Sequence, residues 1–244
     1  MLEIGTPLRR AFAHNDYHQR RPLFDALEQG FTAVEADVFL VDGQLLLGHG
    51  RKDVEPGRTL SSVYLDPLAE LVEDRGHVYA DQPFLLLVDV KSEAGPTYAA
   101  LHDMLSGYLG MLTQYRHDGT LSGPVRVVVS GHTDLAQMEK QLVRFATADV
   151  RSTHLEQALS PVVSMVSDKW AEQFQWLWLT EGWMRRRERA RIARLVDRIH
   201  DAGCTARFWG VLPRTWPTLL AADVDHVIAD DLPGLREFLI AHDR

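Results

Sequence analysis

Short runs of aliphatic residues alternate with amphipathic stretches along the whole chain. Strands, marked by β-branched and aromatic residues, are predicted at 10–14, 31–40, 84–91, 125–130, 145–151, 162–167, 206–211 and 224–229. Helices, marked by apolar positions three and four residues apart, are predicted at 22–29, 66–75, 96–114, 184–202, 216–222 and 233–242. The pair Asp42-Gly43 predicts a tight turn into a short return strand over 45–49.

This alternation favours βα units around a parallel sheet. About eight strands suit a closed barrel better than an open sheet. No composition shift marks a domain boundary. The sequence therefore predicts the α/β fold class, with a single TIM-type (β/α)8 barrel domain over residues 1–244. The tryptophan-rich segment 170–183 fits neither pattern and is expected either to pack a βα unit or to line a lipid-facing pocket.

Composition and charge exclude several classes of function. The chain has 26 basic and 34 acidic residues and a net charge of −8, so we expect no nucleic-acid partner. The run Arg185–Arg189 lies among acids and is interpreted as a solvated helix face. No segment approaches the roughly 20 apolar residues of a membrane span. Because Met1–Gly5 lacks a signal pattern, a cytoplasmic protein, or a secreted one whose leader is removed, is expected. The single Cys204 is expected to fill the core, and no pattern indicates an oligomeric state.

Paired acids mark the strand predicted at 31–40. Side chains alternate between the two faces of a strand, so Val34, Ala36 and Val38 share one face, while Glu35 and Asp37 share the other. The aliphatic face meets the helices of a barrel, which directs both carboxylates inward. Two like charges in a confined interior need a positive partner, and a hard divalent cation accepts oxygen ligands.

The strand predicted at 84–91 repeats this pattern. Asp89 and Lys91 share its inward face, so Asp89 becomes a third metal ligand and Lys91 a fixed cation able to bind a phosphate oxygen. The acids lie toward the carboxyl ends of their strands, where barrel active sites lie. A buried network of structural salt bridges is the alternative interpretation.

Two histidines are placed at the same mouth. His14 ends the first predicted strand, and His49 ends the return strand between two glycines. Cleavage of a phosphodiester requires removal of a proton from the nucleophile and delivery of one to the leaving group. Histidines titrate near neutrality and can do both, so His14 and His49 are predicted as the acid/base pair.

These motifs resemble a known superfamily. His14 to Tyr17, Glu35-Ala36-Asp37, Gly48-His49-Gly50 and Val88 to Lys91 are similar to the phosphatidylinositol-phospholipase-C-like phosphodiesterases. This superfamily includes glycerophosphodiester phosphodiesterases and sphingomyelinase D toxins. The His-Asn-Asp-Tyr motif and Arg21-Pro22-Leu23 most resemble its altered-inheritance-of-mitochondria branch. The later stretches 207–209 and 228–233 are similar to the last two strands of these barrels.

The resemblance implies a metal-dependent phosphodiesterase of TIM-barrel fold, acting on a phospholipid or glycerophosphodiester. It assigns acid/base roles to His14 and His49, and it assigns one Mg²⁺ or Ca²⁺ to Glu35, Asp37 and Asp89. It further implies that substrate contacts Asn15, Lys91 and Trp209. Lys91 is also expected to be catalytic, because it would stabilise charge on the non-bridging phosphate oxygens. Either water or an internal hydroxyl of the substrate is the nucleophile, the latter giving a cyclic phosphate.

The chain departs from the glycerophosphodiesterase pattern at three places. Asn15 replaces the usual arginine, Arg21-Pro22 replaces a Glu-Asn motif, and Asp89 replaces a glutamate. These changes affect the expected substrate and leave the metal ligands and histidines in place. Two other functions are compatible with the residues: a barrel that binds a phosphorylated ligand without turnover, and a metal-dependent hydrolase of carbonyl substrates. The absence of a His-x-His pair after the first strand disfavours the latter.

Overall fold

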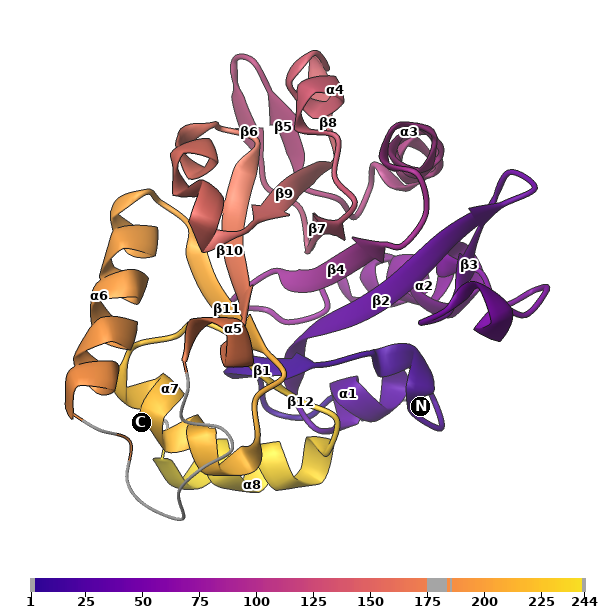
Figure 1. Cartoon of the computed structure of the whole chain (residues 1–244). Coiled ribbons are helices and arrows are strands. Elements are labelled where there is room, and N and C mark those ends of the chain that lie inside the picture. Colours follow the sequence, from indigo (N-terminus) through magenta and orange to yellow (C-terminus); the bar gives the residue numbers. More distant parts are fainter. Residues whose placement is uncertain (1–2, 175–183, 185, 243–244) are drawn as a thin grey trace.

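Eight parallel strands form a nearly closed barrel in the computed structural model, which describes residues 3–174, 184 and 186–242 (Figure 1). In spatial order they are β12 (Val227–Ala229), β1 (Leu8–Ala13), β2 (Phe31–Val41), β4 (Phe84–Val90), β7 (Val125–Gly131), β9 (Ala146–Val150), β10 (Val163–Lys169) and β11 (Thr205–Trp209). A single parallel bridge, between Arg207 and His226, joins β11 to the segment before β12. The predicted TIM-type barrel is confirmed.

Helices cover the outside of this barrel. They are α1 (Phe24–Glu28), α2 (Asp66–Arg75), α3 (Ala94–Leu105), α4 (Leu135–Glu139), α5 (Trp170–Gln173), α6 (Arg186–Asp201), α7 (Trp216–Ala221) and α8 (Leu232–His242). Short helical turns complete the connections: η1 (Asp16–His18), η2 (Arg51–Asp53), η3 (Ser61–Leu65), η4 (Ser106–Tyr108), η5 (Ser152–Leu159) and η7 (Pro213–Thr215). Figure 1 shows α8 beneath β1, and α6 lies against β11. None of the described helices is both long and apolar enough to cross a membrane.

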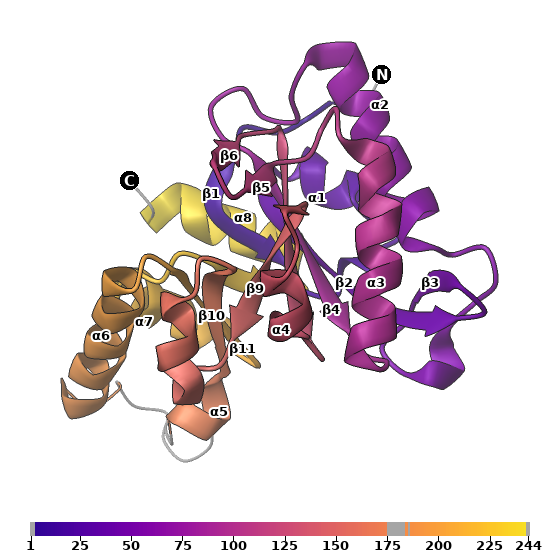
Figure 2. The ribbon, with the colours of Figure 1, turned by 90° about the horizontal axis from the view of Figure 1, so that it is seen from above.

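The helix predicted over 96–114 is wrong in its second half. The helix α3 ends at Leu105, and residues 114–121 instead form a hairpin of β5 (Gln114–Arg116) and β6 (Gly119–Leu121). This hairpin and β8 (Val143–Arg144) make a small antiparallel sheet at the side of the barrel (Figure 2). Gly107 and Gly110 lie within five residues of the end of the helix, and glycine is a poor helix former.

Two apolar layers result from strand alternation. Outward side chains, among them Val34, Ala36 and Val38, pack against the helices in one large core. Inward side chains form a second, smaller cluster that fills the barrel: Phe12, Ala33, Leu85, Leu87, Val128, Met165 and Ile228. The inward side chains between this cluster and the carboxyl ends of the strands are polar. The functional groups therefore gather at those ends.

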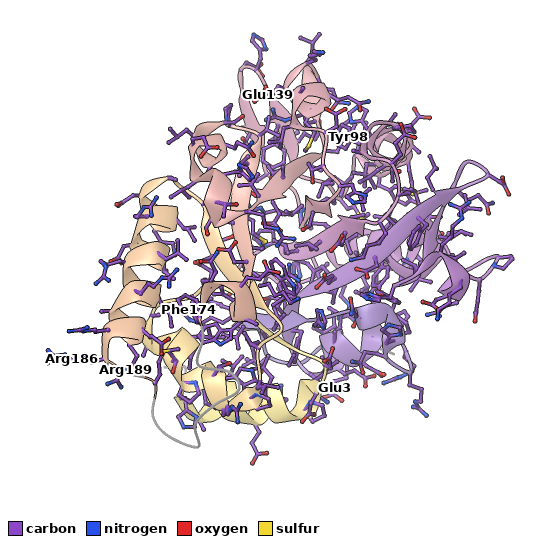
Figure 3. The ribbon with its side chains drawn as sticks, in the orientation of Figure 1. Glu3, Tyr98, Glu139, Phe174, Arg186 and Arg189 are labelled. Atoms are coloured by element: carbon purple, nitrogen blue, oxygen red, sulfur yellow. The ribbon has the colours of Figure 1, made fainter. Side chains whose placement is uncertain are left out.

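Several smaller predictions can also be compared with the structure. Asp42 and Gly43 both have positive φ, at 49° and 80°, as the turn between β2 and β3 (Gln44–Leu47) requires. Cys204 is buried, as predicted. The arginines that begin α6 extend into solvent, so the solvated-face interpretation is confirmed for Arg186 and Arg189 (Figure 3). Trp170 is fully buried in the core, whereas the other tryptophans of the segment 170–183 lie outside the described residues.

Candidate active site

Three inward carboxylates meet at the mouth of the barrel. Asp37 on β2 is in register with Asp89 on β4, and Glu35 lies two residues earlier on β2. Oxygens of all three lie within 4.8 Å of one another. Asp37 Oδ1 and Asp89 Oδ1 are buried and accept no hydrogen bond from the part of the chain that the structure describes. Buried carboxylate oxygens without a donor are compatible with the predicted cation, which takes oxygen ligands.

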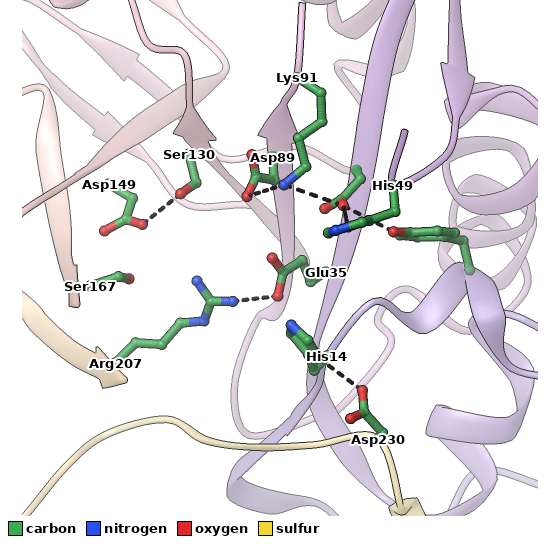
Figure 4. A network of polar contacts seen from close by, with 12 residues as sticks. His14, Glu35, His49, Asp89, Lys91, Ser130, Asp149, Ser167, Arg207 and Asp230 are labelled. Atoms are coloured by element: carbon green, nitrogen blue, oxygen red, sulfur yellow. Dashed lines mark hydrogen bonds and ion pairs between the residues drawn. The ribbon is translucent and has the colours of Figure 1, made fainter. Parts of the chain in front are cut away.

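Two cationic side chains hold these acids from either side (Figure 4). Lys91 Nζ lies 3.0 Å from Asp89 Oδ2 and 3.3 Å from Asp37 Oδ2. Arg207, on β11, forms an ion pair with Glu35 across the barrel. Burial lowers the pKa of Lys91, but the charges of Asp89 and Asp37 outweigh it and raise that pKa above its ordinary value. The ammonium therefore stays charged beside the acids at neutral pH.

His49 is held by the same carboxylate. Its Nδ1 lies 3.0 Å from Asp37 Oδ2, an oxygen that also accepts a hydrogen bond of 2.9 Å from the Tyr17 hydroxyl. An ionised carboxylate only accepts hydrogen bonds, so Nδ1 carries the proton and Nε2 of a neutral ring is free to act as a base. The side chain is 64% exposed, so substrate can reach it.

His14 has its own carboxylate on the opposite side of the acids. Its Nδ1 lies 2.8 Å from Oδ1 of Asp230, which directly follows β12. Burial lowers the pKa of His14, but the hydrogen bond to Asp230 and the charge of Glu35 outweigh it and raise the pKa above its ordinary value. The same hydrogen bond lowers the pKa of Asp230. The pKa of His14 therefore lies above that of an ordinary histidine.

A pH profile can test this pairing. In Asp230→Asn the hydrogen-bonding carboxylate is lost, so the pKa of His14 falls, and the limb of the pH–rate profile that belongs to His14 is expected to move to lower pH. The profile of kcat/KM between pH 5 and 9 measures this shift. Asp231→Asn removes a neighbouring charge without touching His14 and serves as the control. An identical profile in Asp230→Asn would show that the contact does not tune His14.

A buried acid, Asp16, fixes the loop that directly follows His14. Asp16 is fully buried, and its Oδ2 accepts hydrogen bonds from the Leu23 N–H at 2.6 Å and the Tyr64 hydroxyl at 2.9 Å. Burial raises its pKa to about 6 even though both hydrogen bonds lower it. Asn15 precedes it in a left-handed conformation with φ of 45°. His14 and Tyr17 lie on either side of Asp16 in this loop, so the buried acid anchors the segment that carries both. Substrate contact by Asn15 stays a prediction.

Sequence reasoning gave no role to a further set of polar groups inside the barrel. Asp149 on β9 is buried and accepts a 2.7 Å hydrogen bond from Ser130 on β7, and Ser167 on β10 lies nearby in Figure 4. Burial raises the pKa of Asp149 to about 6, although the charge of Arg207 lowers it. The signal was present in the inward alternation of β7, β9 and β10, but no pair of acids two residues apart marks these strands as one marks β2.

Trp209 ends β11 at the rim of this polar set. The guanidinium of Arg151 lies 3.8 Å from the centroid of its ring, and the ring packs against the inner apolar cluster. A charged group stacked on an aromatic face fixes the position of both. The predicted role of Trp209 in substrate binding is compatible with this position and remains a prediction.

The absence of a side chain at Gly131 makes room for the carboxylate of Asp89. It ends β7 with φ of 73°, and a Cβ atom there would lie 2.1 Å from Asp89 Oδ1 and 2.5 Å from the Val90 carbonyl oxygen. Gly131→Ala should therefore displace Asp89 as well as strain the backbone. The matched control is Gly76→Ala, with φ of 78° and no atom within 4 Å of the added Cβ.

Both variants should lose about 1–2 kcal/mol of unfolding free energy to the left-handed conformation. Gly131→Ala should lose about 1–3 kcal/mol more through overpacking, and its metal affinity should fall. Urea unfolding and metal titration measure the two effects. Equal behaviour of the two variants would mean that Gly131 is not needed to seat Asp89.

Solved structures support the fold. The chain superposes with a TM-score of 0.55 and 14% identity on a glycerophosphodiester phosphodiesterase from Thermotoga maritima, covering 96% of this chain and 98% of that one. With a calcium-dependent phosphoinositol-specific phospholipase C from Pseudomonas sp. the TM-score is 0.60 at 11% identity, over 93% and 91% of the two chains. These superpositions confirm the TIM-type barrel fold.

The family follows from the sequence matches. The model of the AIM6-like phosphodiesterase domain matches residues 6–147, and the chain belongs to this family. Altered inheritance of mitochondria protein 6 of Eremothecium gossypii is 34% identical over 145 residues, which cover 51% of this chain and 37% of that protein. The protein of the same name from Saccharomyces cerevisiae is 26% identical, over 90% of this chain and 65% of its own length. The chain thus spans less than two thirds of these relatives.

Proposed function

We propose that this domain cleaves a phosphodiester of a phospholipid or glycerophosphodiester, with His14 and His49 as the acid/base pair. The observation that carries the proposal is the paired orientation of the histidines. Each has a ring nitrogen held by a separate carboxylate, Asp230 or Asp37, and the two flank one cluster of acids. A purely structural salt-bridge network does not require two oriented histidines at its edges.

One Mg²⁺ or Ca²⁺ would be held by Glu35, Asp37 and Asp89, whose closely placed oxygens suit hard cations. When bound, such a cation neutralises charge on the non-bridging phosphate oxygens. The Ca²⁺ dependence in the name of the Pseudomonas phospholipase C is compatible with this choice and does not select between the two ions.

The side chains of the chain itself would carry the proton transfers. One histidine removes a proton from the nucleophile, which is either water or an internal hydroxyl of the substrate, and the other delivers a proton to the departing oxygen. Asp37 and Asp230 keep the rings in one tautomer, and Asp230 also stabilises the charged form of His14. Lys91 binds a phosphate oxygen, while Asn15 and Trp209 contact the remainder of the substrate.

Turnover of bis-p-nitrophenyl phosphate with Mg²⁺, with Ca²⁺ and with EDTA tests the reaction class. A panel of lysophospholipids, sphingomyelin and glycerophosphodiesters then identifies the substrate class. Phosphorus NMR of the products separates attack by water, which yields a monoester, from attack by an internal hydroxyl, which yields a cyclic phosphate. Metal binding without turnover of any diester would favour a barrel that only binds phosphorylated ligands.

A further inference from the structure

An apolar hollow of about 230 Å³ opens beside His14. The segment between β11 and α7 and the end of β12 form its walls. Its apolar lining residues are Val211, Leu212, Pro213, Trp216, Ile228 and Ala229. In the order of the barrel strands, β12 and β1 lie opposite β7 and β9, so this hollow is on the other side of the site from the polar set around Asp149.

The hollow is firmly built. Ile228 belongs to the inner apolar cluster, and Val211 packs against it. Trp216 is 6% exposed, and its ring lies 5.4 Å from that of Phe238 on α8. The N–H and the hydroxyl of Thr215 both donate to the Leu212 carbonyl, at 2.8 Å and 2.6 Å, and fix the loop. A preformed apolar recess next to a few polar groups is the usual form of a small-molecule site.

His14 connects the hollow to the acid cluster. His14 and Asp230 both line the hollow, and Glu35 lies close enough for its charge to act on His14. A phosphate bound by Lys91 and by a cation held in the acid cluster would present one ester oxygen to His14. The group attached to that oxygen would then enter a space bounded mainly by hydrocarbon.

We propose that this hollow binds the aliphatic group carried by the ester oxygen that faces His14, which makes the substrate a phosphodiester of a fatty or other long-chain alcohol moiety. This inference depends on the function proposed above. The volume is below the roughly 300–1,000 Å³ of a site for a whole drug-sized ligand. It accommodates the first part of a hydrocarbon chain, which continues past Leu212, a residue 39% exposed at the rim.

Binding of n-alkylphosphonates tests this proposal without requiring turnover. Calorimetric titration of methyl-, propyl-, butyl- and hexylphosphonate in the presence of the metal gives a Kd for each chain length. Burial of one methylene corresponds to about a three- to four-fold decrease in Kd. We expect this decrease for each methylene that enters the hollow and a plateau once the hollow is full.

Two variants and a control locate the effect. Leu212→Asn makes the rim polar, and Val211→Phe fills the interior, so in both the ratio of the methyl to the hexyl Kd should fall at least five-fold. Leu159→Asn replaces a leucine that is 76% exposed on η5, outside this hollow, and should keep the ratio of the wild type. Thermal unfolding confirms that each variant is folded.

The outcomes separate the two proposals. If methylphosphonate binds but Kd does not depend on chain length, the assignment of the hollow is wrong and the phosphate site stands. A chain-length dependence that survives in both Leu212→Asn and Val211→Phe also overturns the assignment. If no phosphonate binds, methylphosphonate included, the phosphate site itself fails, and the proposed function fails with it.

Discussion

Replacing His14 or His49 by alanine is expected to lower kcat by about 10²–10⁴-fold, the usual contribution of one general acid or base. The loss should fall on kcat more than on KM, because neither ring is among the proposed metal or phosphate ligands. His49 is 64% exposed, so its removal leaves no cavity. Steady-state kinetics on bis-p-nitrophenyl phosphate, with a metal titration of each variant, measures both quantities.

Controls distinguish proton transfer from loss of structure. His77→Ala removes an exposed histidine elsewhere and should leave kcat unchanged. Added imidazole should restore part of the activity of His49→Ala, since the exposed position admits a small base. A decrease of less than ten-fold in both catalytic variants would mean that another group transfers the protons.

Asp37→Asn is expected to abolish the response of the protein to divalent metal. Asp37 is fully buried. Its Oδ2 contacts the hydroxyl of Tyr17, Nδ1 of His49 and Nζ of Lys91, whereas its Oδ1 has no hydrogen-bond donor among the described residues. The amide of asparagine keeps the shape of the side chain, but its NH2 group is a donor placed among other donors. It also lacks the negative charge that attracts a cation. Metal affinity and turnover should therefore be lost together.

Thermal unfolding with Mg²⁺, Ca²⁺ or EDTA provides the measurement. A metal present at 100 times its Kd stabilises the folded state by about 2.7 kcal/mol, so the wild type should melt at a lower temperature in EDTA. Asp37→Asn should melt at the same temperature with and without metal. Asp118→Asn changes an exposed acid in the turn between β5 and β6 and should keep the wild-type response. An equal response in both variants would exclude Asp37 as a ligand.

The inward acids could be predicted because their signal is local. A strand alternates with a period of two, so Glu35 and Asp37 are separated from Val34 and Ala36 by the sequence alone. The same rule brought in Asp89, which the structure pairs with Asp37 across β2 and β4. Turn chemistry was equally local, as Asp42-Gly43 shows.

The partners of His14 and Glu35 could not be predicted, because their proximity depends on the register of distant strands. Asp230 reaches His14 only through the pairing of β12 with β1, and Arg207 reaches Glu35 only when β11 stands across the barrel. The helix predicted over 96–114 is wrong in its second half because the local apolar pattern continues beyond the point where the helix ends. Apolar positions continue at helical spacing from Tyr98 to Leu112, but the chain leaves the helix before Gly107.

The ion pair between Arg207 and Glu35 joins positions 172 residues apart, and this has a consequence for synthesis on the ribosome. The acids leave the ribosome on β2 and β4, whereas the arginine that neutralises Glu35 is translated 172 residues after it. Until then, burying the acids would be costly. Arg207 also makes the bridge that joins β11 to the segment before β12. We therefore expect closure of the barrel and neutralisation of Glu35 to be one event, which cannot occur before Arg207 has left the ribosome.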